Sequence, residues 1–159
     1  MLPSEKLKEL DIVLPPAPTP IASYVAAVKS GNLLYISGQL PLIDGVLPDN
    51  HKGLADDIGI PDAALAARQA AINGLSIIDS EIGINNVKQI VRVNGYVASS
   101  AEFQSQSMVI NGASDFLVSV FALSGKHTRV AVSAPSLPLG SVVELDMIVE
   151  FDNNEDSKE

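Results

Sequence analysis

The sequence predicts a single α+β domain in which two helices pack on one face of a single mixed β-sheet. The chain has 159 residues, of which 47% are hydrophobic, so it is long enough to bury one core and too short for two domains. Runs rich in β-branched residues alternate with two segments of helical periodicity. Glycine and proline clusters separate these segments and mark the turns.

The two ends of the chain are expected to lie outside this domain. Residues 1–20 form a lead-in with a short amphipathic start, followed by PPAPTP, whose prolines favour an extended backbone. The domain itself is expected to span residues 21–151. Residues 152–159 are acidic and lack apolar side chains, so this tail is expected to be disordered.

The first part of the domain is predicted to be a β-hairpin. Two β-prone runs, Tyr24 to Lys29 and Leu33 to Gln39, flank the turn signal Ser30-Gly31-Asn32. Asp44-Gly45 marks a second turn, and the polar stretch from Pro48 to Ile60 is expected to be a loop.

A helix is predicted over residues 61–82, followed by a strand over residues 87–97. Small or apolar residues recur there at steps of three and four, and Gly83 is a stop signal. The residues expected on the inner face of this helix are Ala64, Ala67, Ala71, Leu75, Ile78 and Ile82. The strand VKQIVRVNGYV is rich in β-branched side chains.

A second helix is predicted to open at Ser99-Ser100-Ala101-Glu102, which has the spacing of a capping box, and to end near Gly125. The residues expected to face inward from it are Phe103, Ile110, Leu117 and Phe121.

The last two strands, Arg129 to Ala134 and Val142 to Phe151, are predicted to form a hairpin around residues 135–140. In that hairpin Arg129 and Glu144 would stand opposite each other. One interpretation is a cross-strand ion pair, worth at most about 1 kcal/mol if exposed. The other is functional, because guanidinium can grip a ligand carboxylate and a nearby carboxylate can orient or deprotonate water. The spacing leaves both open.

Several strands are interpreted as apolar on both alternating sets of residues, which indicates burial on both faces of the sheet. Two helices cover one face only. Homo-oligomerisation through the sheet is therefore expected.

Composition argues against several classes of function. The chain has no cysteine, hence no disulfide framework, thiolate metal site or cysteine nucleophile. The net charge of −9 opposes binding to nucleic acid. No run approaches eighteen apolar residues and the start is not a signal peptide, so no membrane association and a cytoplasmic location are expected. His51 and His127 are the only histidines, and no metal site is expected.

Four motifs resemble the reactive intermediate deaminase family, also called YjgF or endoribonuclease L-PSP-like. They are SYVAAVKSGNLLYISGQLP, ARQAAINGL, VINGASDFL and the final pattern R-V-A-V-x-x-x-x-L-P-x-x-x-x-V-E. The resemblance spans roughly Ile21 to Phe151. Its most specific part is Arg129 opening a strand, Leu137-Pro138 at a fixed distance and Glu144 in the last strand.

The resemblance implies a chorismate-mutase-like fold and a homotrimer with clefts between neighbouring subunits. It also implies a hydrolytic deaminase that needs no cofactor. Its substrates would be small enamine or imine acids such as 2-aminoacrylate, and its products a 2-keto acid and ammonia.

The resemblance also assigns roles within the site. Arg129 would hold the substrate carboxylate and Glu144 would position or activate the attacking water. Tyr24 and Asn111 would line the cleft, while Ser37, Gly38 and Ala131 would shape it.

Ser114, Val130 and Ala131 depart from the residues common in the family, and the loop over residues 48–60 is longer than usual. These departures indicate a divergent branch whose pocket takes a different acid. Two other functions stay open: a non-catalytic binder of small carboxylates and, disfavoured by the acidic charge, an endoribonuclease.

Overall fold

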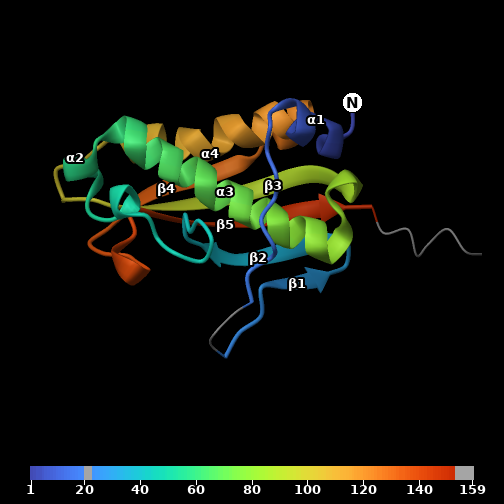
Figure 1. Cartoon of the computed structure of the whole chain (residues 1–159), viewed down its shortest axis with the longest axis horizontal. Helices are drawn as coiled ribbons and strands as arrows, with labels where there is room; N and C mark the ends of the chain where they lie inside the picture. Colours follow the sequence, from blue (N-terminus) through green and yellow to red (C-terminus); the bar gives the residue numbers. More distant parts are fainter. Residues whose placement is uncertain (20–22, 153–159) are drawn as a thin grey trace, which may run out of the picture.

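The protein is an α+β domain built on one mixed five-stranded sheet, in the strand order β1-β2-β5-β3-β4. The structure, a computed structural model, describes residues 1–19 and 23–152. Two long helices, α3 and α4, cover one face of the sheet, and the short helix α1 lies beside the end of α4 (Figure 1). This arrangement confirms the predicted α+β class with a single mixed sheet.

The helices are α1 Pro3–Glu9, α2 Ala55–Ile58, α3 Ile60–Ile82 and α4 Gln106–Phe121. The strands are β1 Ala27–Ser30, β2 Leu33–Gln39, β3 Val87–Ala98, β4 Thr128–Ala134 and β5 Val143–Phe151. Short 3-10 turns occur at Asp49–His51, Ile84–Asn86, Ala122–Gly125 and Pro138–Gly140. The predicted strands and the first helix are thus present, with ends that differ by a few residues.

The first two strands form the predicted hairpin. Ser30 pairs with Leu33, so Gly31 and Asn32 are the two loop residues, and Gly31 has a φ of +59°. Glycine is favoured at such a position because a positive φ costs it no steric strain. The second predicted turn is also present, since Ile43 and Val46 bridge across Asp44-Gly45.

The helix α3 lies between the sheet, α4 and the loop after β2, and its middle is therefore buried nearly all round. Alanines keep it thin enough for close packing, and it ends at Gly83, as predicted. Its crossing with α4 is especially close at Gly112, where a methyl group would overlap the backbone carbonyl of Ala64. Glycine is therefore required there to let the two helices touch.

The predicted start of the second helix is wrong, because α4 begins at Gln106 and not near Ser99. The serines of the supposed capping box make tertiary contacts instead. The Ser99 hydroxyl contacts the Ser133 hydroxyl at 2.7 Å, and Asp56 accepts bonds from both the backbone N–H and the hydroxyl of Ser100. Ile110, Leu117 and Phe121 do face the core, as predicted.

The predicted hairpin between the last two strands is also wrong. The strand β4 pairs with β3 in parallel, and β3 in turn pairs with β5 in an antiparallel register, so β3 lies between the last two strands. Parallel neighbours need a crossover connection, and α4 supplies it between β3 and β4.

The sheet face opposite the helices is polar at its centre, contrary to the expectation of apolar residues on both faces. Along β5 the buried residues Val143, Leu145, Met147, Val149 and Phe151 alternate with Glu144, Asp146, Ile148 and Glu150. Apolar side chains on this face lie mainly on the outer strands: Val28, Tyr35, Val130 and Val132 are 38–53% exposed. We call this surface the open face.

The N-terminal lead-in packs on the domain through its helix. Leu7 of α1 is only 4% exposed and belongs to the core, and the Ser4 backbone N–H donates to Asn85. Ile21 and the tail over residues 153–159 lie outside the described residues, so the expectation of a disordered tail stays a prediction.

Candidate functional site

Arg129 and Glu144 lie on opposite faces of the sheet. Arg129 pairs with Val93, which is buried beneath the helices, whereas Glu144 pairs with Tyr96 on the open face. Two strand spacings, roughly 10 Å, also separate β4 from β5. The predicted cross-strand pairing of Arg129 and Glu144 is therefore wrong, and one chain alone cannot bring both side chains to one small ligand.

The first half of the candidate site, the arginine half-site, comprises Asn111, Ser114, His127 and Arg129. The Arg129 Nη1 donates to Asn111 Oδ1 at 2.9 Å and to Ser114 Oγ at 3.1 Å. Asn111 and Ser114 are three residues apart on α4, so they share a face of that helix. These contacts fix the guanidinium plane against α4.

One edge of the Arg129 guanidinium keeps donors to spare. Its Nη2 makes one long contact, 3.4 Å, to the Ser107 carbonyl, and its Nε has no acceptor within the described residues. Over residues 1–19 and 23–152 the salt bridges are Lys6–Glu9, Lys52–Asp49 and Lys88–Glu150, none of which involves Arg129. A planar edge with Nε–H and Nη2–H side by side matches the two oxygens of a carboxylate.

Ser114 and His127 add a hydrogen-bonded pair that sequence reasoning did not identify as functional. The Ser114 Oγ lies 2.9 Å from His127 Nε2, and His127 Nδ1 lies 2.6 Å from the Gly125 carbonyl. Because a carbonyl only accepts, Nδ1 carries the proton and Nε2 accepts from Ser114. Burial lowers the pKa of His127, the Gly125 bond opposes this, and the charge of Arg129 lowers it further. His127 lies just before β4, two residues ahead of Arg129, and no local sequence pattern reports its contact with Ser114.

The second half, the carboxylate half-site, comprises Gly38, Tyr96, Glu144 and Asp146 on the open face. A methyl group at Gly38 would overlap the Glu144 carboxyl group, so glycine permits their close approach. Burial and then the charge of Asp146 raise the pKa of Glu144. Burial also raises the pKa of Tyr96, with further contributions from Asp146 and Glu144. A carboxyl group with a raised pKa is a better proton acceptor near neutral pH.

Asp146 is held by a chain of side chains across the open face. Arg92 Nε donates to Asn94 Oδ1 at 2.8 Å, and Asn94 Nδ2 donates to Asp146 Oδ1 at 2.6 Å. The arginine therefore orients an amide, and the amide orients the carboxylate next to Glu144.

Tyr24 and Ser37 come together beside the β1-β2 edge. Both line a shallow pocket of about 410 Å³, and the Ser37 hydroxyl donates to the Val25 carbonyl at 2.6 Å. Ser37 therefore anchors the segment that carries Tyr24. Ala131 lies elsewhere, on the same face of β4 as Arg129, and is partly buried against the core.

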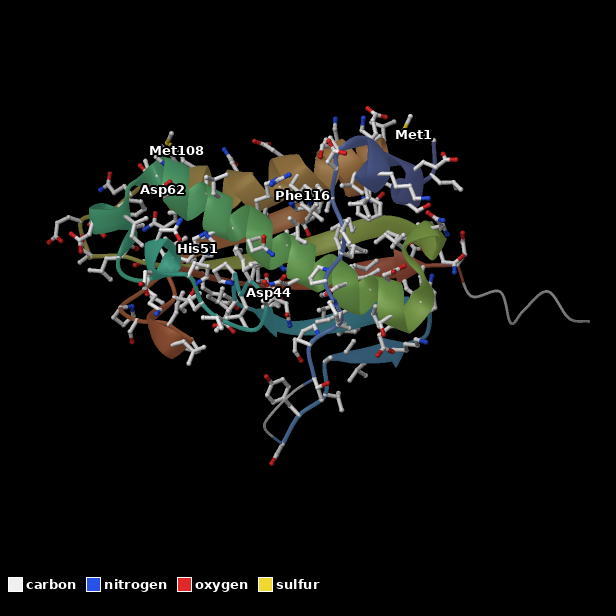
Figure 2. All side chains as sticks on the ribbon, in the orientation of Figure 1. Met1, Asp44, His51, Asp62, Met108 and Phe116 are labelled. Carbon is white, nitrogen blue, oxygen red and sulfur yellow. The ribbon has the colours of Figure 1, made fainter. Side chains whose placement is uncertain are left out.

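The remaining sequence candidates have structural explanations. His51 is buried, with Nδ1 3.1 Å from the Pro41 carbonyl, and its own carbonyl accepts from Val142. Figure 2 shows it at the turn below α3, where it ties the long loop to the start of β5. Within residues 1–19 and 23–152 no three His, Asp or Glu side chains gather as a metal site would require.

The segment Gln106–Gly125 is long and apolar enough to cross a membrane by length and composition alone. Its apolar side chains, however, pack against α3 and the sheet, and Phe116, labelled in Figure 2, meets Arg68 of α3 at 5.3 Å from the ring centre. We therefore interpret it as the core helix of the domain.

The fold is that of a known class of small α+β proteins. The chain belongs to the endoribonuclease L-PSP family, whose model matches residues 15–151 and whose members include YjgF and RidA. This membership confirms the resemblance found in the sequence.

Three relatives show how far the similarity extends. Protein TCP17 of Trypanosoma cruzi is 40% identical over 151 residues, covering 92% of each chain. A structure of a protein of unknown function from Agrobacterium tumefaciens is also 40% identical, with a TM-score of 0.86 over 94% of this chain and 92% of that one. RidA from an Antarctic Psychrobacter is 28% identical, with a TM-score of 0.60 over 85% of this chain and 94% of that chain.

Proposed function

We propose that the protein is a cofactor-independent hydrolytic deaminase of small enamine and imine acids, such as 2-aminoacrylate. Water adds to the imine carbon, the C–N bond breaks, and a 2-keto acid and ammonia leave. The observation that carries the proposal is the Arg129 guanidinium, held by α4 with its Nε and Nη2 edge available to a carboxylate. Similarity to RidA supports the same chemistry.

Glu144 is the proposed group that positions and deprotonates the attacking water. Its raised pKa suits a base that works near neutral pH, and Gly38 leaves room for the Glu144 carboxyl group to lie against the β2 backbone. Tyr24, Ser37 and Ala131 are proposed to line the same cleft, with Asn111 holding Arg129 in place.

The proposed site is shared between copies of the chain. Arg129 and Glu144 lie on opposite faces, so the Arg129 of one copy must meet the Glu144 of another to act on one substrate. We propose a homotrimer with three such clefts, assembled through the open face, in the cytoplasm. The exposed valines on β4 and the aromatic side chain of Tyr35 give this face apolar contact area.

A second candidate is a non-catalytic binder of small carboxylates. It is favoured by the location of Arg129 away from Glu144 in the same chain, because the arginine half-site can hold an anion without any water-activating group. Isothermal titration with 2-keto acids separates the two cases, since binding without turnover supports the binder.

Ribonuclease activity, which the family's name describes, is a weaker candidate for this chain. A net charge of −9 repels the phosphate backbone, and binding to RNA depends on neutralising that charge. RNA incubated with the protein at low and high salt is expected to stay intact.

The deaminase proposal is tested by a coupled assay. A pyridoxal-phosphate enzyme generates the imine from serine or another amino acid, and keto-acid release is compared without protein, with the wild type and with Arg129→Ala. The wild type is expected to accelerate release, and Arg129→Ala is expected to lose that acceleration while staying folded. Arg68→Ala is the matched control, because it removes an arginine that stacks on Phe116 outside the site. No acceleration across several amino-acid precursors would contradict the proposal.

A further inference from the structure

The Ser114 hydroxyl is hydrogen-bonded outside its own helix. Ser76 of α3 and Ser119 of α4 donate to the backbone carbonyl three residues earlier, each at 2.6 Å, which is the usual local partner of a helical hydroxyl. The Ser114 Oγ instead lies 2.9 Å from His127 Nε2 and 3.1 Å from Arg129 Nη1. Side chains outside α4 therefore decide where this hydroxyl lies.

His127 leaves the Ser114 hydroxyl only one arrangement of its hydrogen bonds. The His127 Nδ1 lies 2.6 Å from the Gly125 carbonyl, which can only accept, so Nδ1 carries the ring proton and Nε2 is an acceptor. Ser114 must then donate to Nε2, which leaves the lone pairs of its Oγ for Arg129 Nη1. Burial lowers the pKa of His127, and this keeps Nε2 unprotonated near neutral pH. Each bond from Arg129 to Gly125 thus has a fixed direction.

The Gly125 carbonyl that anchors His127 is itself held against α4. A methyl group at Gly125 would overlap the Leu117 carbonyl, so the turn after α4 packs directly on the helix backbone. The contacts therefore run from α4 through this turn to His127 and return to α4 at Ser114. Because both ends of this path lie on one helix, His127 is fixed relative to Ser114.

We propose that His127, acting through Ser114, is a positioning residue that sets the plane of the Arg129 guanidinium for a bidentate carboxylate. Asn111 gives Nη1 one acceptor at 2.9 Å, and rotation about that single contact would move the Nε and Nη2 edge. The Ser114 Oγ is a second acceptor on the same Nη1, and two acceptors on one planar amino group fix its orientation. The carboxylate would lie on the Nε and Nη2 edge, so neither Ser114 nor His127 needs to touch it.

The consequence of this positioning is a higher affinity for carboxylates. The inference rests on the proposed function only in taking a carboxylate as the ligand of Arg129. An arginine that is already held in its bound orientation loses little freedom when the ligand arrives, whereas ordering one long side chain on binding weakens affinity by about three- to ten-fold. Without His127 or Ser114 the affinity should fall by this factor, which would raise KM and leave kcat nearly unchanged.

Isothermal titration of the whole protein with 2-oxobutanoate measures this affinity. Ser114→Ala removes the hydroxyl, and His127→Phe keeps a ring without the accepting nitrogen. Each is expected to weaken binding by about three- to ten-fold. Ser114→Thr keeps the hydroxyl and is expected to bind nearly as the wild type does, which distinguishes the hydrogen bond from the space that the side chain fills. Ser119→Ala, on the same helix, is the matched control and is expected to bind like the wild type.

NMR of the nitrogen-labelled protein checks the positioning without any ligand. The chain has three arginines, so the Arg129 signals are assigned by their absence from Arg129→Lys. In the wild type the two acceptors on Nη1 should slow rotation about the Cζ–Nη1 bond, and this rotation should be faster in Ser114→Ala and His127→Phe. The ring signals of His127 are expected to show its proton on Nδ1.

Three results would overturn the inference: undiminished affinity in folded Ser114→Ala and His127→Phe, a His127 proton on Nε2, or no binding of 2-oxobutanoate by the wild type. Thermal melting establishes that each variant is folded, and either variant suffices if the other unfolds. The coupled imine assay separates this result from the proposed function. Affinity that depends on Ser114 and His127 in a protein without turnover would sustain the inference and contradict the deaminase, whereas turnover with an unchanged KM in both variants would do the reverse.

Discussion

Glu144 shows how the surroundings of one side chain set both its chemistry and its cost in stability. Burial and the neighbouring Asp146 raise its pKa above the ordinary value of 4.5. The folded protein therefore binds a proton at Glu144 more readily than the unfolded chain does. As the pH rises from the ordinary pKa of 4.5 through the raised pKa of the folded state, ionisation of Glu144 lowers the free energy of unfolding. This loss of stability is complete at pH values above the raised pKa.

Glu144→Gln is accordingly expected to raise the free energy of unfolding at pH 7 while abolishing turnover. A neutral amide keeps the shape of the side chain and removes the buried charge. Urea unfolding of both proteins between pH 3 and pH 8 measures the effect. The difference in unfolding free energy between Glu144→Gln and the wild type should shrink at pH values below the ordinary glutamate pKa of 4.5. A variant that is equally or less stable at pH 7 would show that the carboxylate is well compensated.

At this scale the sequence named candidate site residues without placing them. In the structure Arg129 contacts Asn111 and shares a face of β4 with Ala131, and Gly38 lies against Glu144, while the action of these residues on a ligand stays a prediction. The contact between Ser114 and His127 was not foreseen, because it joins a helix to the turn before β4 and no local pattern reports it.

At the scale of elements, the crossing of α3 and α4 depends on a single missing side chain. Gly112 packs directly on the Ala64 carbonyl, so Gly112→Ala forces the helices apart. We expect a loss of about 1 to 3 kcal/mol in the free energy of unfolding, as for other overpacked cores, and because α4 carries Asn111, carboxylate affinity should fall as well.

Denaturant unfolding and isothermal titration with 2-oxobutanoate check both effects of Gly112→Ala. Ser119→Ala serves as the control, since Ser119 is exposed on the same helix. If Gly112→Ala leaves both the free energy of unfolding and the carboxylate affinity unchanged, then α3 and α4 can move apart without loss of stability.

Local periodicity located the hairpin, α3 and β3 within a few residues, because each pattern is written into consecutive positions. The pairing of β4 could not be found by treating neighbours in sequence as neighbours in the sheet. The arrangement β3, α4, β4 is a strand, helix and strand, for which a parallel crossover is the usual outcome. The order strand, helix, strand can be predicted from the sequence, and it indicates the partner of β4 more strongly than the turn signals at residues 135–140 do.

At the scale of the whole molecule, the open face is the surface that the proposed assembly must cover. Val132 lies on it, 45% exposed in the single chain, so Val132→Lys should leave the fold within about 0.5 kcal/mol of the wild type. In the assembly the same lysine would be buried without a partner, and the copies should separate.

Light scattering after size-exclusion chromatography measures the mass of Val132→Lys. Leu65→Lys is the matched control, because Leu65 is 56% exposed on the outer side of α3 and should leave the assembly intact. Equal masses for both variants would place the contact between copies elsewhere.

The measurement that tests the account most directly is complementation between two inactive variants in the coupled keto-acid assay. Arg129→Ala and Glu144→Gln are each expected to be inactive alone. Because Arg129 and Glu144 lie on opposite faces, a site should take them from different copies, and random mixing of subunits pairs an intact arginine with an intact glutamate in about a quarter of sites. Coexpressed variants should therefore recover about a quarter of wild-type activity, whereas no recovery in verified mixed assemblies would contradict a site shared between copies.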